Sequence, residues 1–173
     1  MVFSAEWLGY LLIIFLFAPL LVTFFIKSER ISRWLRYGLL EFSYYKKMLM
    51  VSLSSAIIAR FVFVEIIRLF YYNPRPFLVL SGVAQLVNHE TTSSFPSGHA
   101  TFYFALAMGV FLYNKKIGHV YIALAGLISF ARIFVGVHWP LDILAGAGLG
   151  SVISVIMYLA YKKMPRKAFL GQG

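Results

Sequence analysis

The sequence predicts an all-α protein, a polytopic bundle of transmembrane helices that forms one integral membrane domain over residues 1–173. Of its 173 residues, 61% are hydrophobic and 13% are charged, whereas soluble domains have roughly half and a quarter. The mean hydropathy is +0.80. The chain has no cysteine, which excludes disulfides, thiolate metal sites and a cysteine nucleophile. The high hydrophobic fraction, the low charged fraction and the mean hydropathy are typical of a membrane protein.

A helix that crosses a bilayer needs about 20 mostly apolar residues. Five runs meet or approach this length, at 7–26, 48–72, 98–113, 120–137 and 141–161. The segment 27–47 carries arginines interleaved with apolar residues at helical spacing. We therefore expect about five spans plus an amphipathic helix in the membrane interface. A solvated cytoplasmic loop is the other interpretation of that segment.

The positive charges predict the orientation. Most of the 16 Lys and Arg residues lie in the first connection, after the third span and in the tail, all on one side of a five-span bundle. The positive-inside rule makes that side, with the C-terminus, cytoplasmic. We therefore expect a plasma-membrane protein, in a bacterium an inner-membrane protein, with 73–97 and 138–140 facing the periplasm or exterior. The net charge of +10 then reflects orientation and attraction to anionic lipid rather than nucleic-acid binding.

Charged side chains inside a span are costly and mark functional candidates. For Arg60 and Glu65 we favour a structural ion pair, because the two can pair with each other within the bundle. Gly146, Gly148 and Gly150 lie inside an apolar span with no strand before them. They indicate close helix packing rather than a nucleotide-binding loop.

Three blocks are polar where the chain is otherwise apolar, at 68–76, 96–99 and 131–142. All three fall near the predicted outer face, so residues distant in sequence can meet in one site. Arg68, Arg75 and Arg132 present planar forks of donors that match phosphate oxygens. Three guanidiniums in one place repel one another unless an anion lies among them. Their gathering predicts a phosphate-binding site.

The second block adds the start of a helix to this site. Ser97 follows Pro96 and is typical of an N-cap residue. The first N–H groups of a helix and the positive end of its dipole favour a bound anion. We therefore expect this helix to begin at the phosphate-binding site.

Two histidines and an aspartate supply candidate reactive groups. Asp142 follows His138 by four residues, so its carboxylate can reach back to the imidazole. A carboxylate on one ring nitrogen fixes the tautomer and leaves the other nitrogen to attack. His99 begins a different helix and is placed to protonate a departing oxygen. With the arginines, these residue types suit phosphoryl transfer.

Taken singly, these residues have ordinary interpretations. A lone histidine near a helix end is usually a hydrogen-bonded interfacial residue, and Arg132 alone is compatible with a snorkelling side chain. Trp139 is interpreted as an interface anchor. The combination of the three blocks is what favours a catalytic site.

In their order along the chain, the blocks resemble the signature motifs of the type 2 phosphatidic acid phosphatase superfamily. That pattern is a basic residue, six residues and Arg-Pro; then Pro-Ser-Gly-His; then Ser-Arg, five residues, His, three residues and Asp. The resemblance extends from Arg68 to Asp142, the motif core of the domain. Arg68 stands where Lys is usual and Ala131 where Ser is usual; neither change removes a chemical role. Membrane members of the family commonly have six spans.

The resemblance implies how the phosphate is bound. Arg68, Arg75 and Arg132 would contact its oxygens. Ser97 and the backbone of Gly98 would complete the cradle. The expected binding partners are a phosphorylated lipid and the surrounding membrane lipids, with no nucleic acid and no obligate protein partner.

The resemblance also implies the chemistry. His138 would be the nucleophile, Asp142 would orient it, and His99 would act on the leaving group. Water would hydrolyse the phosphohistidine without a metal or another cofactor. The expected activity is that of a lipid phosphatase on an envelope lipid: lipid A 1-phosphate, undecaprenyl diphosphate, phosphatidylglycerol phosphate or phosphatidic acid. Preference for a monophosphate or a diphosphate stays open.

Two other functions are compatible with the same motifs. Vanadium-dependent haloperoxidases look similar in these blocks, but they are large and soluble. A lipid-phosphate carrier would use the arginines only to bind. Pure binding needs neither a nucleophile nor its orienter, so the presence of His138 and Asp142 favours an enzyme.

Overall fold

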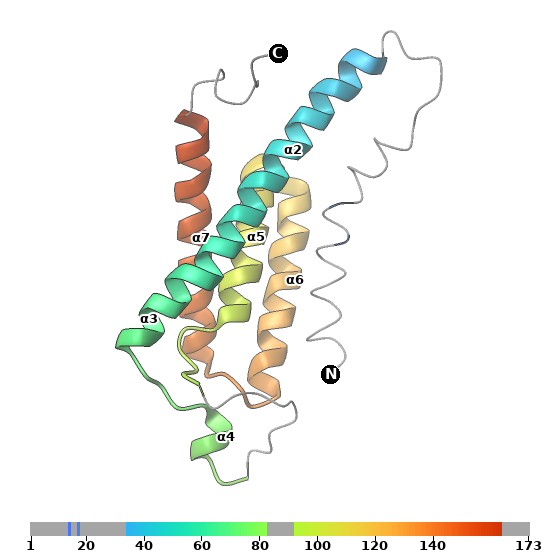
Figure 1. Cartoon of the computed structure of the whole chain (residues 1–173). Coiled ribbons are helices and arrows are strands. Elements are labelled where there is room, and N and C mark those ends of the chain that lie inside the picture. Colours follow the sequence, from blue (N-terminus) through green and yellow to red (C-terminus); the bar gives the residue numbers. More distant parts are fainter. Residues whose placement is uncertain (1–13, 15–16, 18–33, 83–91, 164–173) are drawn as a thin grey trace.

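The structure is a computed structural model that describes residues 34–82 and 92–163, together with the isolated residues 14 and 17. Every regular element in these ranges is a helix (Figure 1). Three helical stretches are long and apolar enough to cross a membrane, Tyr44–Phe70, Lys115–Phe134 and Pro140–Lys163, and Gly98–Tyr113 is a shorter apolar helix. The predicted all-α membrane bundle is confirmed. The predicted span 7–26 lies outside the described residues except for positions 14 and 17.

The first described element is one long helix built from three parts. Helix α2 (Trp34–Ile58) passes through a π-helical turn, η1 (Ala59–Phe63), into α3 (Val64–Phe70). No proline interrupts this run, so nothing removes a helical hydrogen bond before the chain turns extended at Tyr71. Residues 34–47 are therefore the beginning of the helix that forms the second predicted span. They continue into that span without a break and do not form a separate helix; 27–33 lie outside the described residues.

The last three helices are joined by short connections. A short helix, α4 (Pro76–Val79), precedes α5 (Gly98–Tyr113), which is followed by α6 (Lys115–Phe134) and α7 (Pro140–Lys163). The Ser97 hydroxyl accepts a hydrogen bond from the Ala100 N–H, which confirms the predicted N-cap of α5. Between α6 and α7, Gly136 has φ of +73°, a conformation that glycine adopts without strain.

Helix α5 lies in the middle of the bundle and contacts α2, α6 and α7 (Figure 1). The core around it consists mostly of small and aliphatic residues, among them Ala56, Ala59, Ala105, Leu106, Val110, Ala125 and Ile128. Large apolar side chains point outward instead: Leu69 and Phe70 are 81% and 87% exposed. In a bilayer these side chains face lipid, which is as apolar as they are.

Glycines bring the backbones of α5 and α7 together. A Cβ atom on Gly150 would lie 2.2 Å from the carbonyl oxygen of Thr101, and one on Gly146 would lie 2.7 Å from that of Ser97. Neither position has room for a methyl group. The predicted close packing is confirmed at Gly146 and Gly150, but a Cβ atom on Gly148 would have no neighbour within 4 Å. The two close contacts hold the first part of α7 beside the first turn of α5.

The two ends of the bundle differ in chemistry. At one end lie the C-terminus of α5, the start of α6 and the end of α7 (Figure 1). There the Tyr44 hydroxyl donates to the carbonyl of Tyr113, and the Lys115 ammonium lies 3.8 Å from the ring centroid of Phe111. Lys162 and Lys163 end α7 at the same level. The three polar blocks meet at the opposite end.

The glycine contacts predict the effect of a single methyl group. We expect Gly150→Ala to lower the thermal unfolding midpoint in detergent, because overpacking costs about 1–3 kcal/mol. Gly148→Ala is the matched control on the same helix, since nothing lies within 4 Å of a Cβ atom there. That change should leave the midpoint unchanged or raise it. Equal midpoints for the two variants would contradict the close contact.

Candidate active site

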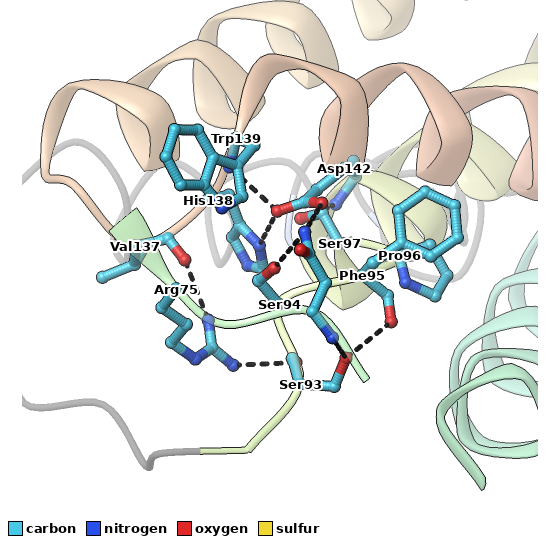
Figure 2. A network of polar contacts seen from close by, with 12 residues as sticks. Arg75, Ser93, Ser94, Phe95, Pro96, Ser97, Val137, His138, Trp139 and Asp142 are labelled. Carbon is cyan, nitrogen blue, oxygen red and sulfur yellow. Dashed lines mark hydrogen bonds and ion pairs between the residues drawn. The ribbon is translucent and has the colours of Figure 1, made fainter. Parts of the chain in front are cut away.

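The candidate site forms where three segments meet: the chain after α3, the start of α5 and the connection from α6 to α7 (Figures 1 and 2). They carry the three polar blocks found in the sequence. The predicted convergence of the blocks at one end of the bundle therefore holds in the structure. The side chains that meet there are mostly buried.

His138 and Asp142 form a buried pair at the start of α7. His138 Nδ1 lies 3.5 Å from Asp142 Oδ2, and each side chain is 1% exposed. The same carboxylate oxygen accepts a 2.8 Å hydrogen bond from the backbone N–H of Trp139. Asp142 thus faces the Nδ1 edge of the imidazole, and the geometry of the ring turns Nε2 away from the carboxylate.

The other oxygen of Asp142 contacts a residue that sequence reasoning missed. The Asn73 side-chain amide donates to Asp142 Oδ1 at 3.3 Å and to Ser94 Oγ at 3.0 Å. Ser94 in turn donates its backbone N–H to the carbonyl of Asn73 at 2.8 Å. Asn73 lies between two of the predicted arginines and is the one uncharged amide in that block. Its position was a signal, but the contact to Asp142 depends on the fold.

Two backbone contacts tie the segments together around this pair. The Ser97 N–H donates to the carbonyl of Asp142 at 3.0 Å, which joins the first turns of α5 and α7. The indole N–H of Trp139 donates to the carbonyl of Pro74 at 2.9 Å. Trp139, predicted as an interface anchor, therefore also connects the α6–α7 segment to the chain after α3 (Figure 2).

Arg75 is fully buried and holds backbone from two other segments. Its Nη1 donates to the carbonyl of Val137 at 3.0 Å, and its Nε donates to that of Thr92 at 3.1 Å. Burial, followed by repulsion from Arg68 and Arg132, lowers the pKa of Arg75 to about 10. The guanidinium still carries its charge at neutral pH. The repulsion also shows that Arg68 and Arg132 both lie within electrostatic range of Arg75.

The other two arginines approach from different helices. Arg68, in the last turn of α3, donates from Nη2 to the carbonyl of Pro96 at 3.1 Å. Its Nε is buried and has no hydrogen-bond partner among the described residues. Arg132, in the last turn of α6, is 2% exposed. Arg68 thus places its guanidinium beside the first turn of α5, and Arg132 places its own beside the α6–α7 connection.

The start of α5 supplies the remaining predicted residues. Ser97 is buried, with its oxygen capping the helix, and Gly98 is covered directly by the side chain of Arg60. His99 follows in the first turn, partly exposed, with its ring centroid 6.3 Å from that of Tyr103. In the described part of the chain, no three His, Asp or Glu residues gather in a way that suits a metal ion.

Comparison with known protein families matches residues 49–166 to the PAP2 superfamily, well over half of the chain. The chain belongs to the PAP2 superfamily. It is 38% identical over 92 residues to the bacitracin transport permease protein BcrC of Bacillus licheniformis, covering 53% of this chain and 45% of the relative. It is 36% identical over 87 residues to the undecaprenyl-diphosphatase BcrC of Bacillus subtilis, covering 50% and 45%. The chain thus spans about half the length of these curated relatives.

More distant relatives include a lipid A 1-phosphatase of Rhizobium etli, 32% identical over 43% of this chain and 32% of the relative. Among solved structures, the chain is similar to LpxE of Aquifex aeolicus. The TM-score is 0.60 and the sequence identity is 27%, with 91% of this chain and 84% of that chain covered. The similarity supports a membrane-embedded helical PAP2 fold for the described bundle.

The environment of His138 in this PAP2 site favours a neutral imidazole. Burial lowers the pKa of His138, while its hydrogen bond to Asp142 opposes the shift, and the charges of Arg75 and Arg132 add to the lowering. The ring is therefore neutral at pH 7, which is the protonation state that a nitrogen nucleophile requires.

Asn73 is expected to act as a positioning residue through Asp142. We predict that Asn73→Ala lowers kcat for phosphate release about tenfold with little change in KM, which corresponds to the loss of a hydrogen bond worth about 1.4 kcal/mol. Asn114→Ala is the control, because Asn114 Oδ1 accepts from the Ile117 N–H at 3.2 Å at the other end of the bundle. Loss of that cap costs about 1 kcal/mol of stability and should not change kcat. Equal kcat for the two variants would rule out the positioning role.

Proposed function

We propose that this chain is a lipid phosphatase that transfers a phosphoryl group from a membrane lipid to His138 and then to water. The observation that carries the proposal is the buried pair of His138 and Asp142, 3.5 Å apart, within electrostatic range of Arg75 and Arg132. A neutral imidazole held by a carboxylate, next to cations that match phosphate oxygens, is the arrangement that phosphoryl transfer requires.

In this proposal the phosphate enters among Arg68, Arg75 and Arg132. The hydroxyl of Ser97 and the N–H groups of Gly98 and His99 complete the cradle, since the first N–H groups of a helix have no acceptor within it. The guanidiniums offset the charge on the equatorial oxygens in the transition state. The bound anion also relieves the repulsion among the three arginines.

The reaction proceeds in two steps. His138 Nε2 forms a bond to phosphorus, the bond from phosphorus to the lipid oxygen breaks, and His99 gives a proton to that oxygen. Water then attacks the phosphohistidine, His99 accepts a proton from the water, and inorganic phosphate leaves with His138 restored. Asp142 stabilises the positive charge that develops on the ring in the first step. Neither step calls for a metal or another cofactor.

The proposed substrates are phosphorylated lipids of the bacterial envelope. The names of the curated relatives support undecaprenyl diphosphate first and lipid A 1-phosphate second. Phosphatidylglycerol phosphate is the third proposed substrate. We propose that the domain 1–173, with its motif core at 68–142, acts without a protein partner. Nucleic acid is not an expected partner.

The proposed location is the plasma membrane, with the site at its outer or periplasmic face. Lys115, Lys162 and Lys163 lie at the end of the bundle away from the site. The positive-inside rule assigns that end, and the C-terminus, to the cytoplasm. The substrate would then approach from the outer leaflet.

Binding or transport of a lipid phosphate without catalysis is the second candidate, because one relative is named a transport permease. A haloperoxidase-like activity shares the motifs but not the membrane bundle. A carrier has no need of a nucleophile and its orienting carboxylate. The buried pair of His138 and Asp142 therefore favours the phosphatase.

Phosphate release tests the proposed function directly. We expect the purified protein in detergent to release phosphate from at least one of undecaprenyl diphosphate, lipid A, phosphatidylglycerol phosphate and phosphatidic acid, with a chelator present. His138→Ala should abolish release while retaining part of the phosphate binding, because the arginines remain. Specific lipid binding by the wild type without any release would favour the carrier.

A further inference from the structure

Arg60, eight residues before the first motif arginine, also reaches the site. It lies in the π-helical turn Ala59–Phe63, and its side chain covers the first residue of α5. A Cβ atom on Gly98 would lie 2.4 Å from Arg60 Nε and 2.9 Å from Arg60 Cζ. The guanidinium is thus in direct contact with the Pro-Ser-Gly-His segment. Single π-helical turns are rare and are frequent at functional sites.

The predicted ion pair of Arg60 and Glu65 is confirmed, but Glu65 is shared. Its Oε1 lies 2.5 Å from Arg60 Nη1 and 3.5 Å from Arg68 Nη1. One carboxylate therefore serves two guanidiniums, and the cluster keeps a net positive charge. Arg68, through its i,i+3 contact, would neutralise Glu65 even without Arg60. A structural ion pair thus leaves the position of Arg60 over Gly98 unexplained.

Arg60 differs from the buried arginines in its access to a ligand. Its side chain is 27% exposed, whereas Arg75 is 0% exposed. Arg60 is also within electrostatic range of Arg68, so an anion held by Arg68 lies beside a second cation. An accessible positive charge this close to the phosphate cradle is suited to bind a second anionic group of the same substrate.

The place of Arg60 along its helix indicates which group that is. The Cα atom of Arg60 lies eight helical positions before that of Arg68, about 12 Å along the axis, toward the bundle interior. The two guanidiniums nevertheless converge, because both contact Oε1 of Glu65. A lipid substrate has its reacting phosphate at the membrane surface and its tail in the bilayer. Arg60 therefore approaches the phosphate cradle from the tail side, and an anionic group that it binds lies next to the reacting phosphate on that side. In a lipid diphosphate, this is the phosphate that carries the tail.

We propose that Arg60 binds the tail-side phosphate of a lipid diphosphate and so selects diphosphates over monophosphates. This inference rests on the proposed function. When His138 attacks the terminal phosphorus, the bond to the bridging oxygen breaks and its electron pair stays with the departing lipid monophosphate. Arg60 stabilises the charge that grows on that product, so its contribution increases toward the transition state.

The test compares prenyl diphosphate and prenyl monophosphate of the same tail length in the same detergent. We expect Arg60→Gln to lower the ratio of kcat/KM for diphosphate over monophosphate about tenfold, the effect of losing one hydrogen bond between charged groups. Arg60→Lys, which keeps the charge, should recover part of the ratio. Glu65→Gln should keep or raise the ratio, because it frees Arg60 from a competing carboxylate.

A purely structural ion pair makes the opposite prediction. Breaking it from either side would reduce turnover of both substrates alike, so an unchanged ratio in Arg60→Gln overturns the proposal. Calorimetric binding of methylenediphosphonate and methylphosphonate supplies a measurement without turnover. The wild type should prefer the diphosphonate and Arg60→Gln should lose that preference; no preference in the wild type also overturns the proposal. Absence of turnover on every lipid phosphate would instead defeat the proposed function.

Discussion

The geometry of the site depends on Asp142. Its two carboxylate oxygens and its backbone carbonyl contact all three polar blocks: His138 and Trp139 in its own block, Asn73 after α3, and Ser97 at the start of α5. A buried carboxylate is costly unless its lone pairs are satisfied. The contacts that satisfy it are the same ones that hold the blocks in register, so stability and site geometry have a common cause.

Close helix packing makes this arrangement possible. Gly146 and Gly150 let α7 approach the carbonyls of Ser97 and Thr101, which places the start of α7 beside the start of α5. The Ser97 N–H can then reach the carbonyl of Asp142. The gathered arginines oppose folding through their mutual repulsion, and Arg75 offsets part of that cost by donating to the carbonyls of Thr92 and Val137. A bound phosphate would offset more.

Local patterns predicted most of the described helices and the meeting of the three polar blocks at one end of the bundle. The N-cap at Ser97, the small-residue contact at Gly150 and the four-residue spacing of His138 and Asp142 depend on neighbours in the chain or on one helix face, so they are visible in the sequence. The charge pattern of 27–47 favours an interfacial helix, but no proline lies between residues 34 and 70, so α2 continues into the second span. The span 7–26 stays a prediction.

Long-range contacts were not predictable in the same way. Asn73 lies 69 residues from Asp142, and nothing local to either residue indicates that they meet. Arg60 and Glu65 were expected to pair and do so, but the contact of Arg60 with Gly98 depends on how the π-helical turn packs on α5. Such contacts follow from the three-dimensional packing of the helices, which hydropathy and motif spacing do not specify.

The most direct test of the account is to isolate the covalent intermediate. The purified protein, with a chelator present, would be mixed with a lipid that it hydrolyses, labelled with ³²P in its terminal phosphate. The reaction would be quenched in alkali within one turnover, and the labelled residue would be mapped by mass spectrometry. Phosphoryl transfer to His138 predicts an acid-labile, base-stable phosphate on His138 that is absent from His138→Ala. Rapid turnover with no label on the protein, or with the label on His99, would contradict it.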